Sequence, residues 1–399
     1  MHHRRPTTST TMDNKRVANR TTTATILLAF VIFLTIAGLP SDIAHAQAAE
    51  VAVAVEPAQF AFYINPPGTT ERLSRPTSIF FDKYFGELFV TDMGNNRISI
   101  FDGNGRYKYE FTGGSYFSSP VDIAVDAEGY IFVLGSTSEG RHLFKFDFDG
   151  KYVATYEVPS MYADTSVMIS SFDLSDSGEL FLFDQIRNRV LVMYPDGEIA
   201  RSFEVFTGLT GEERIEQVVG KLRICGSHIV LVSGSLGSAY IYDLEGQLER
   251  RVGHKGSERG QLAFPAAATM TSNGTVIILD RMSHNYVIFD SLSRPVAEIG
   301  GRGDNPGWFY QPTLLELDNH CHVIIGQIFH DRVQSIDLPD LDLFKKSDNC
   351  HPGIRGSAGN TGAYHFAINE QHINETKRAS DATKYLNAIS NTRIPRRYF

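Results

Sequence analysis

The heptapeptide Gly178-Glu-Leu-Phe-Leu-Phe-Asp184 decides the fold, because its pattern recurs at a nearly constant spacing along the chain. Five other short apolar runs follow a turn in the same way and begin at residues 86, 129, 227, 274 and 320. The steps between the six starting residues are 43, 49, 49, 47 and 46 residues. Self-similarity at a fixed period of this length indicates a repeat architecture in which each repeat is one supersecondary unit.

Each repeat contains four extended segments joined by turns. In the second repeat, residues 120–126 and 129–135 are followed by a segment that ends at Asp147 and a segment that begins at Tyr152. The intervening Asp149-Gly150 is a strong hairpin pattern when apolar runs flank it. Four antiparallel strands repeated six times predict an all-β, six-bladed β-propeller with a channel on its axis.

Two glycine-spaced segments resemble the blade junction of NHL repeats: Gly253-His-Lys-Gly256-Ser-Glu-Arg-Gly260-Gln-Leu-Ala-Phe264-Pro265 and Gly301-Arg-Gly303-Asp-Asn-Pro-Gly307-Trp-Phe309. Residues 90–101 resemble the core of that repeat. The likeness covers about residues 70–340 and is weakest at residues 233–238, which lack the Asp, Asn and Arg of the core. The resemblance implies a six-bladed propeller of the kind used mostly for recognition, although a few NHL proteins are enzymes.

Residues 1–48 match a secretory signal peptide. A cationic segment over residues 1–22 precedes an apolar run over residues 24–39, and Ala44-His-Ala46-Gln-Ala48 supplies small residues for cleavage. The alternative is an uncleaved anchor, because a run of sixteen residues is just below spanning length. We predict cleavage, no stable membrane span afterwards, and an exported protein that is periplasmic, cell-surface or extracellular.

The remaining chain divides into a propeller over residues 49–344 and a basic, irregular C-terminal tail over residues 345–399. Residues 51–55 or 59–64 are expected to close the ring beside residues 332–337. The tail carries nine basic and four acidic residues, whereas the whole chain has a net charge of −9. The acidic propeller excludes nucleic acid as a natural partner and favours a cationic one.

Three carboxylates and three arginines hold corresponding positions in the repeats. Asp92, Asp184 and Asp280 end the second strand of their repeats and are weak candidates for an ion site, the alternative being hydrogen bonds within their own loops. Arg97, Arg189 and Arg332 follow the same loops. They either recognise an anion or pack over the neighbouring blade and pair with an acidic side chain.

The loops between second and third strands share one face with the blade junctions. We expect a protein or glycan partner to bind this face through the three arginines together with Asn96, Asn188 and Trp308, and through the junction aromatics Tyr116, Phe117, Phe309 and Tyr310. The resemblance implies that a multihaem cytochrome is a conceivable partner, since exported bacterial NHL proteins sometimes accompany such cytochromes.

The alternative function is a propeller hydrolase or lyase with a central metal ion, Ca²⁺ or Zn²⁺. The sequence contains no Gly-x-Ser-x-Gly, Walker or His-Glu-x-x-His motif, and of the histidines in the repeats only His228 and His320 hold the same place. We therefore predict a non-enzymatic scaffold without a cofactor. Among the three cysteines, Cys225 is expected in the core, and Cys321 and Cys350 are a possible disulfide.

Overall fold

The computed structural model describes residues 53–65, 72–157, 167–215 and 217–344. The predicted signal peptide and the basic tail lie outside these ranges. The regular secondary structure of the described residues is almost entirely β-strand, and their single α-helix is α2 (Gly211–Ile215). No helix within the described residues is long and apolar enough to cross a membrane.

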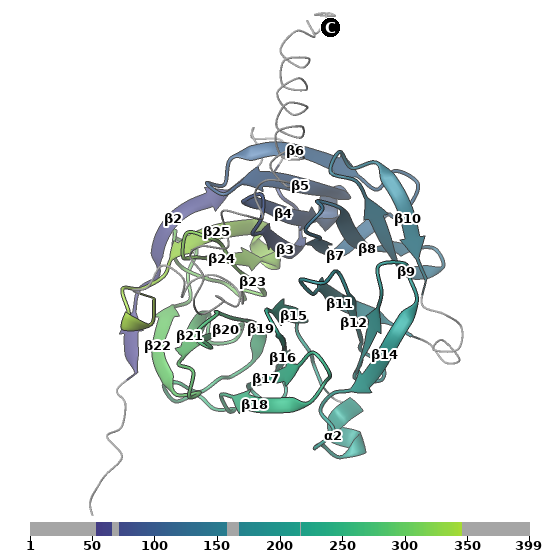
Figure 1. Ribbon diagram of the computed structural model, residues 1–399. Helices are drawn as coiled ribbons and strands as arrows, with labels where there is room; N and C mark the ends of the chain where they lie inside the picture. Colours follow the sequence, from purple (N-terminus) through teal and green to yellow (C-terminus); the bar gives the residue numbers. More distant parts are fainter. Residues whose placement is uncertain (1–52, 66–71, 158–166, 216, 345–399) are drawn as a thin grey trace, which may run out of the picture. The chain divides into compact units, whose positions relative to one another are not determined.

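Six four-stranded antiparallel units surround a central axis (Figure 1), which confirms the predicted six-bladed propeller. Blade one consists of β3 (Pro76–Asp82), β4 (Glu87–Asp92), β5 (Arg97–Asp102) and β6 (Tyr107–Thr112), and blade two of β7 (Ser119–Val125), β8 (Ile131–Thr137), β9 (Gly140–Phe146) and β10 (Tyr152–Tyr156). Blade three consists of β11 (Ile169–Leu174), β12 (Leu180–Asp184), β13 (Arg189–Met193) and β14 (Ile199–Glu204), and blade four of β15 (Arg223–Cys225), β16 (His228–Ser233), β17 (Ser238–Asp243) and β18 (Leu248–Val252). Blade five consists of β19 (Pro265–Met270), β20 (Val276–Asp280), β21 (Asn285–Phe289) and β22 (Pro295–Gly300), and blade six contains β23 (Leu314–Leu317), β24 (His322–Gln327), β25 (Arg332–Asp337) and the N-terminal strand described next.

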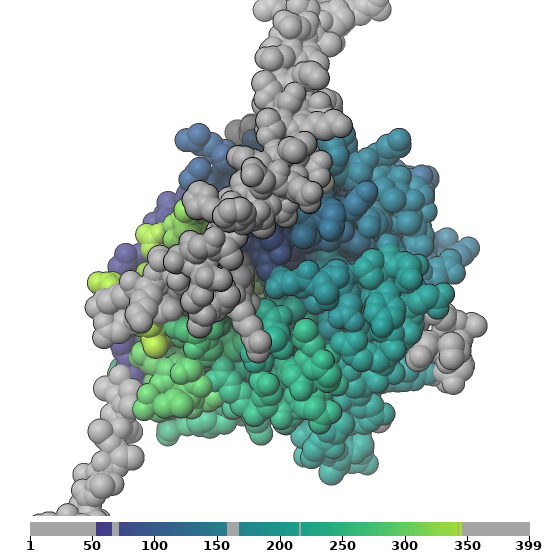
Figure 2. Space-filling model, in the orientation of Figure 1, coloured from purple at the N-terminus to yellow at the C-terminus, as the bar shows by residue number. Residues whose placement is uncertain are grey.

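An N-terminal strand completes blade six. β2 (Gln59–Ile64) pairs antiparallel with β25, as the sequence predicts, so the purple start of the described chain lies beside its yellow-green end in Figures 1 and 2. The preceding strand β1 (Ala54–Glu56) adds in parallel to β22 of blade five, an attachment that the sequence does not indicate. Closure matters because an open ring would leave an unpaired edge strand.

The apolar core lies between neighbouring blades rather than inside any one of them. Ile98 and Ile100 of β5 pack with Ile123 of β7 and Val133 of β8, and all four side chains are fully buried. Burying an aliphatic side chain of this size contributes about 1.5–3 kcal/mol. Because second strands such as β12 are covered on both faces, they appear in the sequence as continuous apolar runs instead of alternating ones.

The strand directions give the propeller two distinct ends. The loops between second and third strands and the blade junctions form one end, which we call the loop face. The turns between first and second strands and between third and fourth strands form the other end, which we call the turn face. The partner-binding face predicted from the sequence is the loop face.

Candidate functional site

One position on every innermost strand holds the same register against the second strand of its blade. Each residue at this position pairs with the equivalent residue of its second strand. The six residues are Phe80, Ala124, Asp173, Arg223, Thr269 and Glu316. Three of the six, Asp173, Arg223 and Glu316, are ionisable. The channel therefore carries a charged cluster contributed by blades three, four and six.

Arg223 holds this cluster together from blade four. Its Nη1 lies 3.5 Å from Oδ2 of Asp173, and its Nη2 lies 2.5 Å from Oε2 of Glu316. All three side chains are buried. Burial lowers the pKa of the Arg223 guanidinium, but the fields of Glu316 and Asp173 outweigh it and the net shift is upward. Burial also raises the pKa of Glu316.

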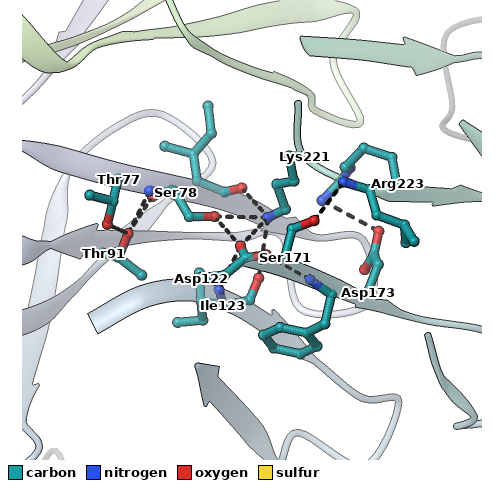
Figure 3. Close-up of polar contacts among 12 residues, drawn as sticks. Thr77, Ser78, Thr91, Asp122, Ile123, Ser171, Asp173, Lys221 and Arg223 are labelled. Carbon is teal, nitrogen blue, oxygen red and sulfur yellow. Dashed lines mark hydrogen bonds and ion pairs between the residues drawn. The ribbon is translucent and has the colours of Figure 1, made fainter. Parts of the chain in front are cut away.

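A second ion pair crosses the channel beside the first. Lys221, in the junction before β15, places Nζ 2.7 Å from Oδ1 of Asp122 and 2.8 Å from Oγ of Ser78 (Figure 3). The same Asp122 oxygen accepts the Ser78 hydroxyl at 2.6 Å, while its Oδ2 accepts the backbone N–H of Phe172 at 3.0 Å. One lysine thereby connects blades one, two and four and partly fills the channel.

A cavity of about 350 Å³ adjoins the charged cluster at the turn face. Its floor includes Asp173, Arg223 and Glu316. Its walls come from the ends of the innermost strands and the turns that follow them: Phe80 to Tyr84, Val125 to Glu128, Tyr130, Phe132, Lys145, Leu174 to Gly178, Pro195, Ile224 and Gly226. Side chains of the ion pairs fill the channel at this level, and the cavity lies beside them at the turn face.

The cavity wall includes four acidic and five aromatic residues. Burial raises the pKa of Asp82 to about 6 and also raises the pKa of Asp126. Lys145 lies over the Tyr130 ring, 3.9 Å from its centroid, and 3.8 Å from Oδ2 of Asp126. This internal pairing of an ammonium group with an aromatic ring and a carboxylate is the chemistry with which such a cavity would hold an external cation.

The two faces differ in charge. Among the described residues between strands, the turn face has eleven acidic and four basic side chains, and the loop face has seven acidic and nine basic ones. The turn-face acids are Asp126, Glu128, Asp147, Asp149, Asp176, Glu179, Asp196, Glu198, Glu245, Asp290 and Asp318, beside Lys83, Arg106, Lys151 and Arg294. The loop-face acids are Glu139, Glu157, Glu212, Glu213, Glu258, Asp304 and Asp331, beside Arg72, Arg75, Arg187, Arg214, Lys221, Lys255, Arg259, Arg281 and Arg302. The net acidity of the propeller is therefore concentrated at the end that contains the cavity.

The three carboxylates predicted from the repeat positions bond within their own blades. Asp280 is fully buried, and it accepts the backbone N–H groups of Met282, Ser283 and Phe264 at 2.9–3.0 Å. Asp92 accepts the N–H of Ser74 at 2.7 Å, and Asp184 those of Met168 and Ile186 at 3.3 and 3.2 Å. Asp184 and Asp280 each join the junction before their blade to the loop after their second strand, and Asp92 bonds the junction before blade one. These contacts match the alternative in which the carboxylates hydrogen-bond within their own loops instead of holding an ion.

Blade two lacks this carboxylate because an aromatic ring takes its space. Gly135 occupies the corresponding position, and a Cβ built there would lie 2.5 Å from Cβ of Phe117. Phe117 is buried, and so is Phe309 in the last junction. The expectation that these two aromatics are available to a partner is therefore wrong, because both fill gaps between blades.

The three predicted arginines stay close to their own loops. Arg97 is buried and bonds Asp92 through Nε and Glu110 through Nη1, both at 2.7 Å. Arg189 Nε lies 3.0 Å from Asp184. Arg332 donates to the carbonyl oxygens of Asp304 and Trp308, at 2.7 and 3.0 Å. These contacts fit the packing alternative better than recognition of an anion.

The other predicted loop-face residues differ in exposure. Asn188 is buried, and its amide donates to the carbonyl oxygen of Arg214 at 2.6 Å. Asn96 is partly buried, and both asparagines have the positive φ, 53° and 48°, that ends the tight loop. Trp308 is 45% exposed and remains available to a partner. Tyr310 stacks between His284 and His330.

The cysteines are consistent with the predicted roles as far as the structure describes them. Cys225 is free and buried, which confirms the core assignment. Cys321, in the turn before β24, is disulfide-bonded. Cys350 lies outside the described residues, so the Cys321–Cys350 pairing stays a prediction.

Sequence reasoning missed the channel cluster. Asp122, Asp173, Arg223 and Glu316 each interrupt a short apolar run at the start of a repeat, and aligning those runs would have placed the last three at one level. An ionisable residue in such a run was a usable indication of a channel-facing position. Lys221 has no equivalent in the other repeats, and its role could not be inferred in this way.

No protein-family model matches the chain, and no curated protein matches it. Among solved structures, a protein of unknown function from Bacteroides thetaiotaomicron is 12% identical with a TM-score of 0.51, and the match covers 71% of this chain and 74% of that chain. An auxiliary nutrient binding protein from Bacteroides ovatus is 13% identical with a TM-score of 0.51, covering 68% and 71%. A virginiamycin B lyase from Staphylococcus aureus is 12% identical with a TM-score of 0.48, covering 70% and 99%. These likenesses concern the fold alone.

Proposed function

We propose that this protein is an exported, non-enzymatic binding platform that recognises a cationic protein partner at the turn face. The observation that carries the proposal is the concentration of acidic side chains at the end of the propeller that contains the cavity. A field of one sign over a concave surface attracts partners of the opposite sign and accelerates their association.

The cavity supplies the specific part of the recognition. A volume of about 350 Å³ suits one or two side chains of a partner. Tyr84 lines the cavity and is 53% exposed, and the next residue, Phe85, is 52% exposed. Aromatic rings beside carboxylates favour lysine and arginine side chains, whose charged heads and apolar stems need both kinds of contact.

The charged cluster supports binding rather than catalysis. Asp122 pairs with Lys221, and Asp173 and Glu316 both face Arg223. A carboxylate held by a cation and by backbone N–H groups is a poor general base. The alternative, a propeller hydrolase or lyase with a central ion, lacks support from Asp92, Asp184 and Asp280, because their oxygens fasten the loops.

A second candidate surface is the loop face, which the sequence analysis favoured for a protein or glycan partner. Ile186, Met282 and Phe329 occupy equivalent loop positions and are 50%, 58% and 59% exposed, beside the exposed Trp308. Apolar side chains repeated on one face suit a protein contact. Membership of the NHL repeats and export remain parts of this proposal, and both are compatible with either surface.

The test compares matched charge removals on the two faces. A fluorescent decalysine peptide is titrated with the wild-type chain, with the turn-face variant E128Q/D176N and with the loop-face variant E212Q/E258Q, and binding is followed by anisotropy at two salt concentrations. We expect the turn-face variant to weaken binding about three- to tenfold and high salt to weaken it further. Equal or greater weakening by the loop-face variant, or equal binding of a decaglutamate peptide, would overturn the proposal.

A further inference from the structure

The turn between β23 and β24 in blade six brings one carboxylate and two imidazoles together. Asp318 is almost fully buried, and its Oδ1 accepts the backbone N–H groups of His320 and His322, each at 2.8 Å. Cys321, between the two histidines, has a φ of 65°. This left-handed residue folds the turn so that both imidazoles lie on the side of the carboxylate.

The second carboxylate oxygen is the point on which the two rings converge. Oδ2 of Asp318 lies 2.6 Å from Nδ1 of His322 and 3.9 Å from Nδ1 of His320. The possible ligand atoms of the three residues all lie within 4.8 Å of one another. Oxygen and nitrogen ligands lie about 2.0–2.2 Å from zinc, so they stand a little over 3 Å apart in a tetrahedral site. The His320 contact must shorten and the His322 contact must lengthen by less than 1 Å each, which small rotations of the two imidazoles supply.

A fourth residue orients one imidazole in the manner of metal-binding proteins. Nε2 of His322 lies 3.3 Å from Oδ1 of Asp337, the last residue of β25. When the outer nitrogen of a histidine donates to a carboxylate, the other nitrogen is fixed as the ligand atom. Asp337 therefore leaves Nδ1 of His322 as the ligand atom directed at Asp318.

From this geometry we propose that Asp318, His320 and His322 form a binding site for a divalent transition metal of the zinc class. Two imidazoles and one carboxylate are a ligand set that zinc accepts, with a fourth position left for water or a partner's side chain. The metal takes the place of the proton shared by His322 and Asp318. The site is accessible, because the His320 side chain is 60% exposed.

The turn that carries the site contacts the wall of the cavity. Asn319, within the same turn, donates from Nδ2 to the carbonyl oxygen of Lys83, a residue of the cavity wall in blade one. A metal bound here would add positive charge to the acidic turn face and would stiffen the contact between the last and first blades. The site stands whether or not the proposed cationic partner binds.

The test titrates ZnCl₂ into the wild-type chain and two alanine variants by calorimetry. His320→Ala removes an exposed ligand, whereas the matched control His330→Ala removes a histidine on the loop face that pairs with Asp304 at 3.4 Å. We expect His320→Ala to weaken the tightest zinc equivalent at least about tenfold and His330→Ala to leave it unchanged. Asp337→Asn should weaken the same equivalent by about 10- to 100-fold while the circular dichroism spectrum stays that of the wild type.

A thermal readout is independent of stoichiometry. Zinc should raise the melting temperature of the wild type and of His330→Ala, because a ligand that binds the folded state stabilises it, and should raise that of His320→Ala by clearly less. The proposal is overturned if the wild type binds no zinc at 100-fold molar excess. It is equally overturned if His320→Ala retains the tightest equivalent and the same rise in melting temperature.

Discussion

Nζ of Lys221 lies 2.7 Å from Oδ1 of Asp122, so the junction before blade four is held by the innermost strand of blade two across the channel. Asp122 is 2% exposed, and the same carboxylate bonds Ser78 of blade one and the backbone of blade three. One ion pair thereby links four blades near the axis. Its removal should affect the closure of the whole ring.

We expect Lys221→Met to lower the free energy of unfolding by about 2–4 kcal/mol, because it leaves the Asp122 carboxylate buried without its counter-ion. The double variant Lys221→Met/Asp122→Asn should lose less than the sum of the single variants, because the uncompensated charge is gone. Urea unfolding at pH 7 measures both. Strictly additive losses would contradict a direct coupling between the two side chains.

Asp82→Asn should stabilise the protein at neutral pH. Burial raises the pKa of Asp82 from 3.8 to about 6, so between these pH values the unfolded chain has lost a proton that the folded chain keeps. Stability contributed by this group is therefore present below pH 4 and is lost as the pH rises to 6. We expect a gain of about 1–3 kcal/mol at pH 7.5 and none at pH 4. Asparagine can still accept the N–H of Tyr84, and a gain that does not depend on pH would refute this account.

Arg97→Ala should destabilise the propeller, whereas Trp308→Ala should not. Arg97 is 6% exposed and bonds two carboxylates, one of which is the fully buried Asp92. Its loss should cost about 2–4 kcal/mol. Trp308 is 45% exposed, and its removal should change the melting temperature by no more than a degree or two. Thermal unfolding of the two variants measures both effects. An Arg97→Ala variant as stable as the wild type would mean that the ion pairs of Arg97 contribute little to the stability of the propeller.

Peptide mapping without reductant should identify one disulfide that contains Cys321, and we predict Cys350 as its partner. Cys225 is free, and burial raises the pKa of its thiol, so it should react with iodoacetamide only after unfolding. Modification of all three cysteines in the native, unreduced chain would exclude the bond.

The sequence indicated the architecture more closely than the site. From the repeat pattern we expect the six blades to start near residues 76, 119, 169, 220, 265 and 312, and the observed innermost strands begin at 76, 119, 169, 223, 265 and 314. The agreement has a local cause, because turn residues and apolar runs act within one hairpin and recur in each repeat. The larger deviation, at blade four, falls where the preceding junction carries α2 and Lys221.

The sequence could not decide the role of a side chain that had two physical outcomes. Arg97 and Asp92 were placed correctly in the repeat, but the sequence could not say whether they face a ligand or each other. Their 2.7 Å contact depends on the pairing of β4 with β5 and on burial by the neighbouring blade. Phe117 likewise was predicted at a surface, yet it fills the space that Gly135 leaves.

The sequence by itself determined the number of blades and the order of strands, because these follow from periodicity and from hairpins between neighbours in the chain. It limited the closing strand to two candidates, residues 51–55 or 59–64, and the structure chose the second. Only the tertiary structure decided where charges meet. Arg223 reaches Asp173 and Glu316, which stand 50 residues before and 93 residues after it, because closure of the ring brings the innermost strands around one axis. The acidic turn face and the cavity arise in the same way, from side chains that are scattered along the chain and gathered by the common direction of the strands.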